Sequence, residues 1–383
     1  MAEDALSTAE LVDLVRRVFA PREDDRGLLV LIDLPDEDVP DHGAWAVRRE
    51  MAADWARRLD EAKGSLGLAR VGVALYRNVK RPNQELPSLA RLHGGGPLPR
   101  DAASLKGAPV PFEELFAGYD IFLAPTEFSA TAPLKNAARR HGFRAATMPG
   151  LAPAMFPALR LDWTEVDARC RALKERLDAA DAARFVFEAA GQRHELLLDL
   201  RFRTAHASGG LLHERGTAGN LPSGESYVAP YEGERDGAPS RSAGTLPLEL
   251  DGELVVYRID GNRVVEVGGS GPAARAERHD LAAEPAYGNV AELGLGILRD
   301  YGIGPIGELL LDEKLGLHIA FGRSDHLGGV TGPDAWHDPS RVVHIDRVFI
   351  PEVMPRIAVR ELDLVAADGA AEPLMRDGVY VRT

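Results

Sequence analysis

The sequence contains a single cysteine, Cys170, among 383 residues. One thiol cannot form a disulfide within the chain, and it cannot build a thiolate-rich zinc or iron–sulfur site. The cysteine lies in an amphipathic stretch from Val166 to Leu177, which indicates a small core residue on a helix and not a nucleophile. A disulfide framework and soft-metal chemistry are therefore excluded.

Long apolar runs and an excess of positive charge are also missing. No apolar run approaches transmembrane length, and the first residues, MAEDALSTAELVDL, lack the basic-then-apolar pattern of a signal peptide. The formal net charge is -14, whereas nucleic acids and anionic membranes attract clustered Lys and Arg. We expect a soluble, cytoplasmic protein that binds neither, with acidic residues that serve solubility or surround metal ions.

The first half of the chain alternates strand and helix patterns. Four apolar runs suit strands buried on both faces: residues 28–34, 71–76, 121–125 and 143–148. Helical periodicity marks residues 44–59 and 130–142, and Ser7 with Glu10 has the spacing of a capping box. This alternation predicts an α/β domain with a parallel sheet. The Pro- and Gly-rich segment 82–109 is expected to be a long loop or lid.

The pattern changes after a predicted helix over residues 162–179. Short strand-like runs follow. Turn signals lie between successive runs at Asp251-Gly252 and Gly261-Asn262. We therefore predict two domains, an α/β domain over residues 1–179 and a mainly antiparallel β (α+β) domain over residues 180–383, which holds the metal-binding and catalytic residues.

The string VVHIDRVFI places His344 and Asp346 two residues apart in a strand-like run. Their side chains point to the same face of a strand. Burial of an unpaired carboxylate is costly, and a metal ion would compensate both side chains. The alternative is a solvent-exposed polar face.

Four further residues have settings that suit a site. Glu313 lies five residues before His318, which opens an apolar run; Glu292 lies in a glycine-flanked segment; and Glu225 follows the turn Pro222-Ser223-Gly224. Each has an ordinary alternative: a hydrogen-bonded histidine, a loop charge or a surface turn glutamate. The residues alone leave these alternatives open.

Four strings occur in a recognisable order: NLPSGE, NVAELGLG, DEKLGLHIAFGRS and VHID. They resemble the motifs of the thermophilic aminopeptidase family, the bacterial metallo-exopeptidases of the aminopeptidase T and aminopeptidase S type. The resemblance covers most of residues 180–350 and extends weakly to TMPGL at 147–151.

The resemblance implies two divalent metal ions, zinc, cobalt or manganese, which activate a water molecule to hydrolyse a peptide or small amide. The implied metal ligands are Glu225, Glu292, Glu313, His318, His344 and Asp346. Hard oxygen ligands with two imidazoles suit these metals. The resemblance also implies a homodimer, and it makes Glu225 either a ligand or the catalytic base.

Three departures from the family pattern affect the expected chemistry. Asp325, followed by His326, stands where the family carries a tyrosine after GRS, and an ionised carboxylate cannot donate to an oxyanion as a phenol can. The string GILRDYG replaces an Asn-Pro turn. The inserted segment 330–340 adds Trp336, His337 and Asp338, which either reshape the pocket or form a surface loop.

A second resemblance points to another reaction. The ring-cleaving 2,5-dihydroxypyridine dioxygenases look like relatives of this fold and hold one iron ion with two histidines and an aspartate. His344 and Asp346 would supply two of these ligands, but Glu292 stands where a histidine is expected, which favours the dinuclear hydrolase. A third alternative is a specialised enzyme that keeps the metal site without peptide turnover.

Overall fold

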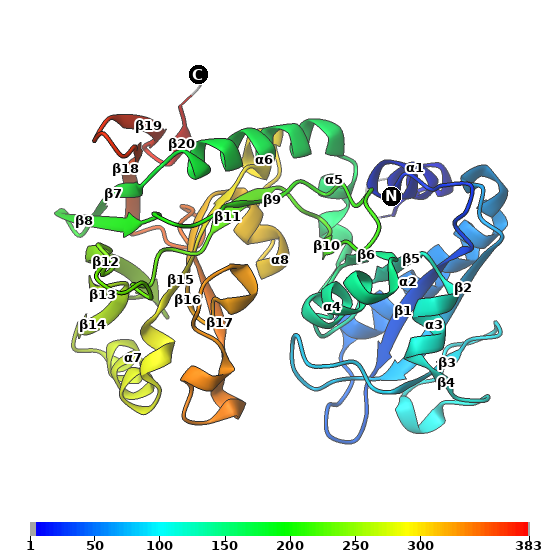
Figure 1. Ribbon diagram of the computed structural model, residues 1–383. Helices are drawn as coiled ribbons and strands as arrows, with labels where there is room; N and C mark the ends of the chain where they lie inside the picture. The colour runs from blue at the N-terminus through cyan, green and yellow to red at the C-terminus, as the bar shows by residue number, and fades with distance from the viewer. Residues whose placement is uncertain (1–4, 382–383) are drawn as a thin grey trace. The chain divides into compact units, whose positions relative to one another are not determined.

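The computed structural model describes residues 5–381 and divides into two compact units (Figure 1). Among these residues, unit 1 comprises 5–167, 208–223 and 306–311, and unit 2 comprises 168–207, 224–305 and 312–381. Both units are discontinuous in sequence, unlike the predicted single division near residue 180. The fold is α+β, with one mixed sheet and antiparallel sheets, as the sequence predicts. Within residues 5–381, no helix is long and apolar enough to cross a membrane.

Unit 1 is built on a seven-stranded sheet of order β10-β6-β5-β1-β2-β3-β4. These strands are β1 (Gly27–Leu34), β2 (Arg70–Arg77), β3 (Leu89–Leu92), β4 (Val110–Pro111), β5 (Ile121–Ala124), β6 (Arg144–Thr147) and β10 (Ala218–Asn220). The pairs from β10 to β2 run parallel, and β3 pairs antiparallel with β2. The predicted parallel sheet is confirmed. The segment 82–109, predicted as a long loop or lid, is mostly loop but includes the short strand β3 and a 3-10 turn at Ala102–Ser104.

The helices of unit 1 are α1 (Thr8–Phe19), α2 (Gly43–Glu61), α3 (Phe112–Gly118), α4 (Thr131–His141) and α5 (Phe156–Leu159). Ser7 and Glu10 form the expected capping box at the start of α1. Phe116 of α3 stacks on Phe143 at 5.1 Å between ring centroids, and Phe143 contacts Phe122 of β5 at 4.4 Å. This aromatic group belongs to the core that α3 and α4 form with the sheet.

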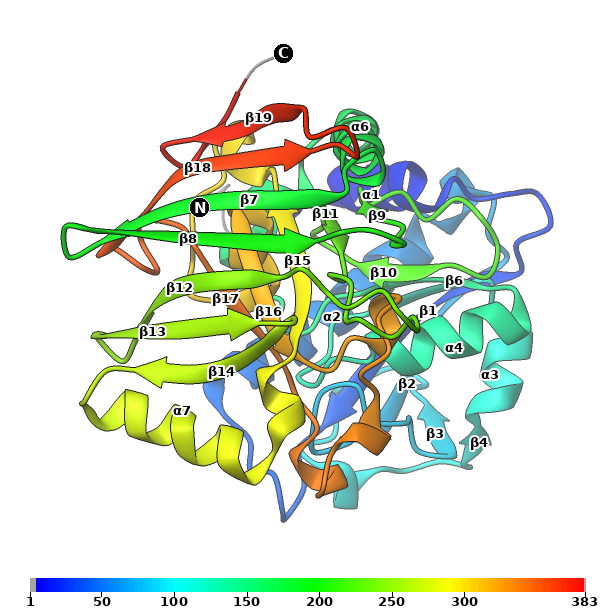
Figure 2. The same ribbon diagram turned by 60° about the vertical axis from the view of Figure 1, so that its left-hand side comes forward.

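Unit 2 contains two sheets. The eight-stranded sheet has the order β14-β13-β12-β8-β7-β18-β19-β20, and Figure 2 shows its strands lengthwise, one above another from β19 to β14. Its strands are β7 (Ala182–Ala189), β8 (Gln192–Asp199), β12 (Ala243–Leu250), β13 (Glu253–Asp260), β14 (Arg263–Gly268), β18 (Ile357–Val365), β19 (Ala371–Arg376) and β20 (Val379–Tyr380). The predicted turns lie in its hairpins, where Asp251, Gly252, Gly261 and Asn262 all have positive φ.

The five-stranded sheet of unit 2 has the order β17-β16-β15-β11-β9. Its strands are β9 (His206–Ser208), β11 (Glu225–Val228), β15 (Val290–Gly296), β16 (Leu317–Gly322) and β17 (His344–Val348). Tyr257 of the larger sheet meets Phe321 of this one edge to face, with the ring centroids 5.3 Å apart. This contact joins the two sheets of unit 2 through buried aromatic side chains.

The helices α6 (Trp163–Asp178), α7 (Pro272–Ala283) and α8 (Leu309–Asp312) complete the fold. Cys170 on α6 is fully buried, and its backbone carbonyl accepts a hydrogen bond from the Ser226 hydroxyl of β11 at 2.6 Å. The prediction that Cys170 is a core residue of a helix is confirmed.

Candidate metal centre

All six predicted ligands lie in unit 2, on or beside the five-stranded sheet. Glu225 opens β11, Glu292 lies in β15, His318 lies in β16, and His344 and Asp346 lie in β17, whereas Glu313 lies in the short 3-10 turn before β16. Strand register brings the five strand residues onto one face. In an antiparallel pair, directly opposite residues share a face, as do residues two apart along a strand.

Small residues stand opposite each ligand on the neighbouring strand. Glu225 pairs with Gly296, His318 with Gly294, and His344 with Gly322, while Ala320 lies between Glu292 and Asp346. A Cβ atom on Gly294 would lie 1.9 Å from Nε2 of His318. These positions therefore give the ligand side chains the room to converge over the sheet.

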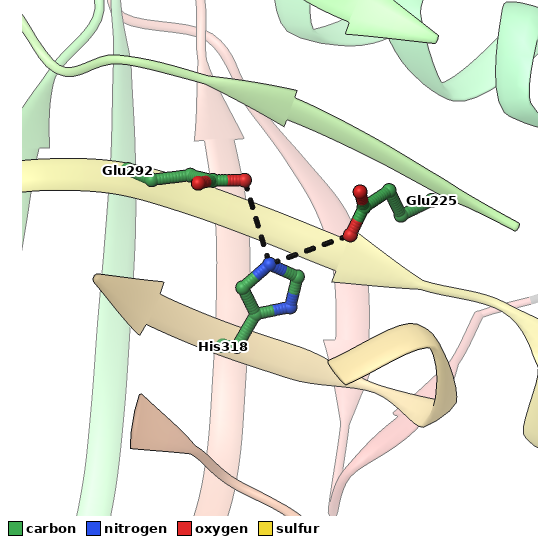
Figure 3. Close-up of side chains that lie close together, drawn as sticks. All are labelled: Glu225, Glu292 and His318. Atoms are coloured by element: carbon green, nitrogen blue, oxygen red, sulfur yellow. Dashed lines mark ion pairs between the residues drawn. The ribbon is translucent and has the colours of Figure 1, made fainter. Parts of the chain in front are cut away.

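Glu225, Glu292 and His318 form the inner half of the centre (Figure 3). One ligand atom from each lies within 4.8 Å of the others. Nε2 of His318 is 3.5 Å from Oε2 of Glu225 and 3.5 Å from Oε1 of Glu292. All three residues are buried, so their charges are held away from water.

Glu292, His344 and Asp346 form the outer half, which uses the second oxygen of Glu292. Nε2 of His344 is 3.0 Å from Oε2 of Glu292 and 3.6 Å from Oδ1 of Asp346. Nδ1 of His344 donates to the backbone carbonyl of Arg323 at 2.7 Å. This hydrogen bond orients the ring so that Nε2 faces the carboxylates, an arrangement typical of metal-binding histidines.

Glu313 belongs to neither triad, although the resemblance implied it as a ligand. Its carboxyl group contacts the ammonium group of Lys314, which also lies 2.6 Å from Oε1 of Glu225. The Lys314 side chain is only 2% exposed. Sequence reasoning missed this lysine. The available signal was its position inside DEKLGLH, between two expected ligands and beside apolar residues.

The protonation of the centre without an ion reflects its negative charge. Burial disfavours the charged form of His318, but Glu292 and Glu225 outweigh this effect and raise its pKa to about 9. Burial would also raise the pKa of Glu292, but His318 and His344 outweigh it and hold that pKa well below its ordinary value. Burial raises the pKa of Glu313 to about 8 against the opposing charge of Lys314, with a contribution from Asp346. The centre therefore attracts positive charge.

Oε2 of Glu225 is a second sign that the centre suits a cation. It is buried and has no hydrogen-bond partner among residues 5–381. An unsatisfied buried carboxylate oxygen is costly, whereas an ion between Glu225, Glu292 and His318 would satisfy it. Carboxylates with imidazoles are donors that zinc, cobalt and manganese accept, so the donor set fits a divalent ion.

One departure from the resembled pattern, Asp325 with His326, lies beside the outer half. Asp325 is ion-paired with Arg323 at 2.5 Å. The His326 ring lies 5.1 Å from the His344 ring, edge to face. Burial lowers the pKa of His326 to about 4, and the charge of His344 contributes to that shift.

The inserted segment 330–340 is anchored and is not a plain surface loop. Trp336 is 6% exposed and belongs to a small apolar cluster with Ala286 and Tyr287. The backbone N–H groups of His337 and Asp338 donate to the Glu284 carboxylate. Neither His337 nor Asp338 joins a ligand triad of the described residues.

No family model and no curated protein matches the sequence. Two solved structures are similar over nearly the whole chain. The 2,5-dihydroxypyridine dioxygenase from Pseudomonas putida KT2440 has a TM-score of 0.62 at 14% identity and covers 99% of both chains. Wild-type AmpT from Thermus thermophilus, a thermophilic aminopeptidase, has a TM-score of 0.55 at 17% identity, over 98% of this chain and 99% of AmpT. At these identities the likeness shows a shared fold.

Proposed function

We propose that this chain is a metal-dependent enzyme that hydrolyses an amide bond, removing the N-terminal residue of a peptide or cleaving a related small amide. The observation that carries this proposal is Glu292, whose two oxygens face two different imidazoles in overlapping triads. A carboxylate shared in this way suits two neighbouring divalent ions. The order of the four sequence motifs and the fold shared with AmpT support the same reaction.

A pair of bound divalent ions would supply an activated water molecule and polarise the scissile carbonyl. In this proposal Glu225, Glu292 and His318 hold the inner ion, and Glu292, His344 and Asp346 hold the outer one. Lys314 fixes one oxygen of Glu225 and leaves the other without a hydrogen-bond partner in the described chain, which favours Glu225 as a ligand over a free base. The Arg323 carbonyl keeps Nε2 of His344 directed at the site.

The second candidate is ring cleavage by a mononuclear iron enzyme. The likeness to the dioxygenase, with a TM-score of 0.62, favours it. The outer triad alone also provides three ligand atoms for one ion. Against it, this triad contains one imidazole and two carboxylates, whereas the iron facial triad uses two histidines and one carboxylate.

Metal analysis and two activity assays separate these functions. The purified protein is loaded with zinc, cobalt, manganese or ferrous iron, and bound metal is counted by mass spectrometry. Aminoacyl-nitroanilides report hydrolysis, and oxygen uptake with 2,5-dihydroxypyridine reports ring cleavage.

Two ions per chain with nitroanilide turnover would support the hydrolase. One iron with oxygen uptake would overturn it in favour of the dioxygenase. Bound metal without either activity would point to a specialised enzyme on the same fold. The variant His344→Ala should lose metal, and His337→Ala, a change to an exposed histidine outside both triads, is its matched control.

A further inference from the structure

We propose that Lys314 is a permanent cation of the metal centre, and that it withdraws Glu313 from the ligand set. Five residues, and not the six implied by the family resemblance, would then hold the divalent ions. This inference rests on the proposed function, because it defines which residues of that site meet the metal.

The contacts of Lys314 support this role. Its ammonium group is buried and contacts two carboxyl groups, Glu225 at 2.6 Å and Glu313. A lysine is seldom buried unless it is paired. Here its partners are two of the predicted ligands, so the lysine uses carboxylate oxygens that an ion would otherwise take.

Lys314 divides the two oxygens of Glu225 between two cations. Oε1 contacts Lys314, and Oε2 faces His318 without a hydrogen-bond partner in the described part of the chain. Glu225 can therefore offer one oxygen to an ion and cannot chelate with both. Lys314 acts here as a positioning residue, because it sets the direction from which Glu225 meets the metal.

The backbone around Lys314 is fixed against the sheet. A Cβ atom on Gly296 would lie 2.2 Å from the carbonyl carbon of Lys314 and 2.6 Å from the carbonyl oxygen of Glu313. The Gly296 N–H also donates to the Gly316 carbonyl at 2.8 Å. Only a glycine at position 296 allows this close approach of the turn that carries Glu313 and Lys314 to strand β15.

The charge balance explains why a permanent cation is needed. Glu225 and Glu292 share one triad, Glu292 and Asp346 share the other, and Glu313 lies in the turn before β16. The ammonium group of Lys314 lies against two of these carboxyl groups, Glu225 and Glu313. Lys314 therefore offsets part of the repulsion among the carboxyl groups within the fold itself.

The test compares Glu313→Gln with Glu225→Gln for metal content, and Lys314→Met with Lys314→Arg for thermal unfolding in chelator and in zinc. We expect Glu313→Gln to keep the wild-type number of ions and Glu225→Gln to bind fewer. We expect Lys314→Met to lower the unfolding midpoint in chelator by about 5 °C or more. Addition of zinc should restore most of the lost unfolding temperature of Lys314→Met. Lys314→Arg, which keeps the positive charge, should show a smaller fall of the midpoint in chelator.

Loss of ions in Glu313→Gln equal to that in Glu225→Gln would overturn the ligand set. An equal fall of the Lys314→Met midpoint in chelator and in zinc would mean a purely structural lysine. A wild-type protein without any ion would overturn the proposed function and the ligand count together. In that case, unfolding in chelator would still test the role of Lys314. If the unfolding midpoint of the double variant Glu313→Gln/Lys314→Met is higher than that of Lys314→Met, the permanent cation is supported. If the two midpoints are equal, it is refuted.

Discussion

The two halves of the metal centre share Glu292 but are held in different ways. In the inner half, the His318 side chain is 1% exposed and its Nδ1 has no hydrogen-bond partner within residues 5–381. In the outer half, the His344 side chain is 20% exposed and its Nδ1 donates to a backbone carbonyl. Packing and charge therefore hold the inner half, whereas a hydrogen bond holds the outer half beside solvent. Water and substrate should reach the outer half first.

Glu292→Gln should break both halves at once and have the largest effect. The amide loses the negative charge that faces both imidazoles. Loss of supporting groups alone weakens metal sites by about 10–100-fold, so we expect about 100-fold or more for each ion. Isothermal titration with zinc measures this change. The exposed Glu266→Gln is the control, and wild-type affinity in Glu292→Gln would refute the shared ligand.

The halves should differ most clearly in the stability of the metal-free protein. His318→Ala leaves buried carboxylates without their partner, which costs about 3–5 kcal/mol. His344→Ala removes a partly exposed ring, its backbone hydrogen bond and its ion pairs with Glu292 and Asp346. Because Glu292 keeps His318 as a partner and this half lies nearer solvent, we expect a smaller cost of about 1–2 kcal/mol. Urea unfolding in chelator measures both free energies of unfolding. Equal losses would contradict the distinction between a packed and a solvent-facing half.

Gly294→Ala should damage the inner half selectively. The new Cβ atom would lie 1.9 Å from Nε2 of His318, so the buried ring would have to move away from its place in the triad. Overpacking of this kind costs about 1–3 kcal/mol. We expect the loss of the inner ion with retention of the outer one, measured by metal counting. Gly304→Ala, where a Cβ atom meets nothing within 4 Å, should leave both ions in place.

The metal-free protein should lose stability as pH rises from about 6.5 to 9. The pKa of His318 is raised from 6.5 to about 9, so the stability from its charged form is complete below pH 6.5 and is lost as pH rises through 9. The raised pKa of Glu313, about 8, has the same sign. We expect a loss on the order of 2 kcal/mol in chelator.

Zinc should remove this pH dependence, because ions replace the protons on the imidazoles. Unfolding midpoints at several pH values, with chelator and with zinc, provide the measurement. A midpoint in chelator that rises over the same pH interval would contradict the protonation of the inner half.

Asp325→Ala should have the smallest effect, because it changes only the surroundings of the outer half. Its ion pair with Arg323 is about one third exposed, and such pairs contribute about 0.2–1 kcal/mol. We expect both ions and a nearly unchanged midpoint. Loss of the outer ion in this variant would show that Asp325 supports His344, and it would redraw the boundary of the site.

The sequence predicted the local structure where one rule dominates. Buried apolar runs predicted β1, β2 and β5, and the turn residues at 251–252 and 261–262 predicted two hairpins. Strands β7 and β12 were missed, and so was helix α7. Strand β7 pairs with β18, which lies far along the chain and is not contained in any local pattern.

The sequence by itself determined which residue types were present for a metal site and the order in which they occur. Only the tertiary structure decided which of them meet. Strand register sets Glu292 and Asp346 on either side of Ala320 and His318 opposite Gly294, and no local periodicity contains that information. Glu313 has the chemistry and the spacing from His318 that the resemblance implies for a ligand, and its carboxyl group contacts the buried Lys314 instead of joining either triad. Contacts of this kind depend on proximity in three dimensions, which no local pattern contains.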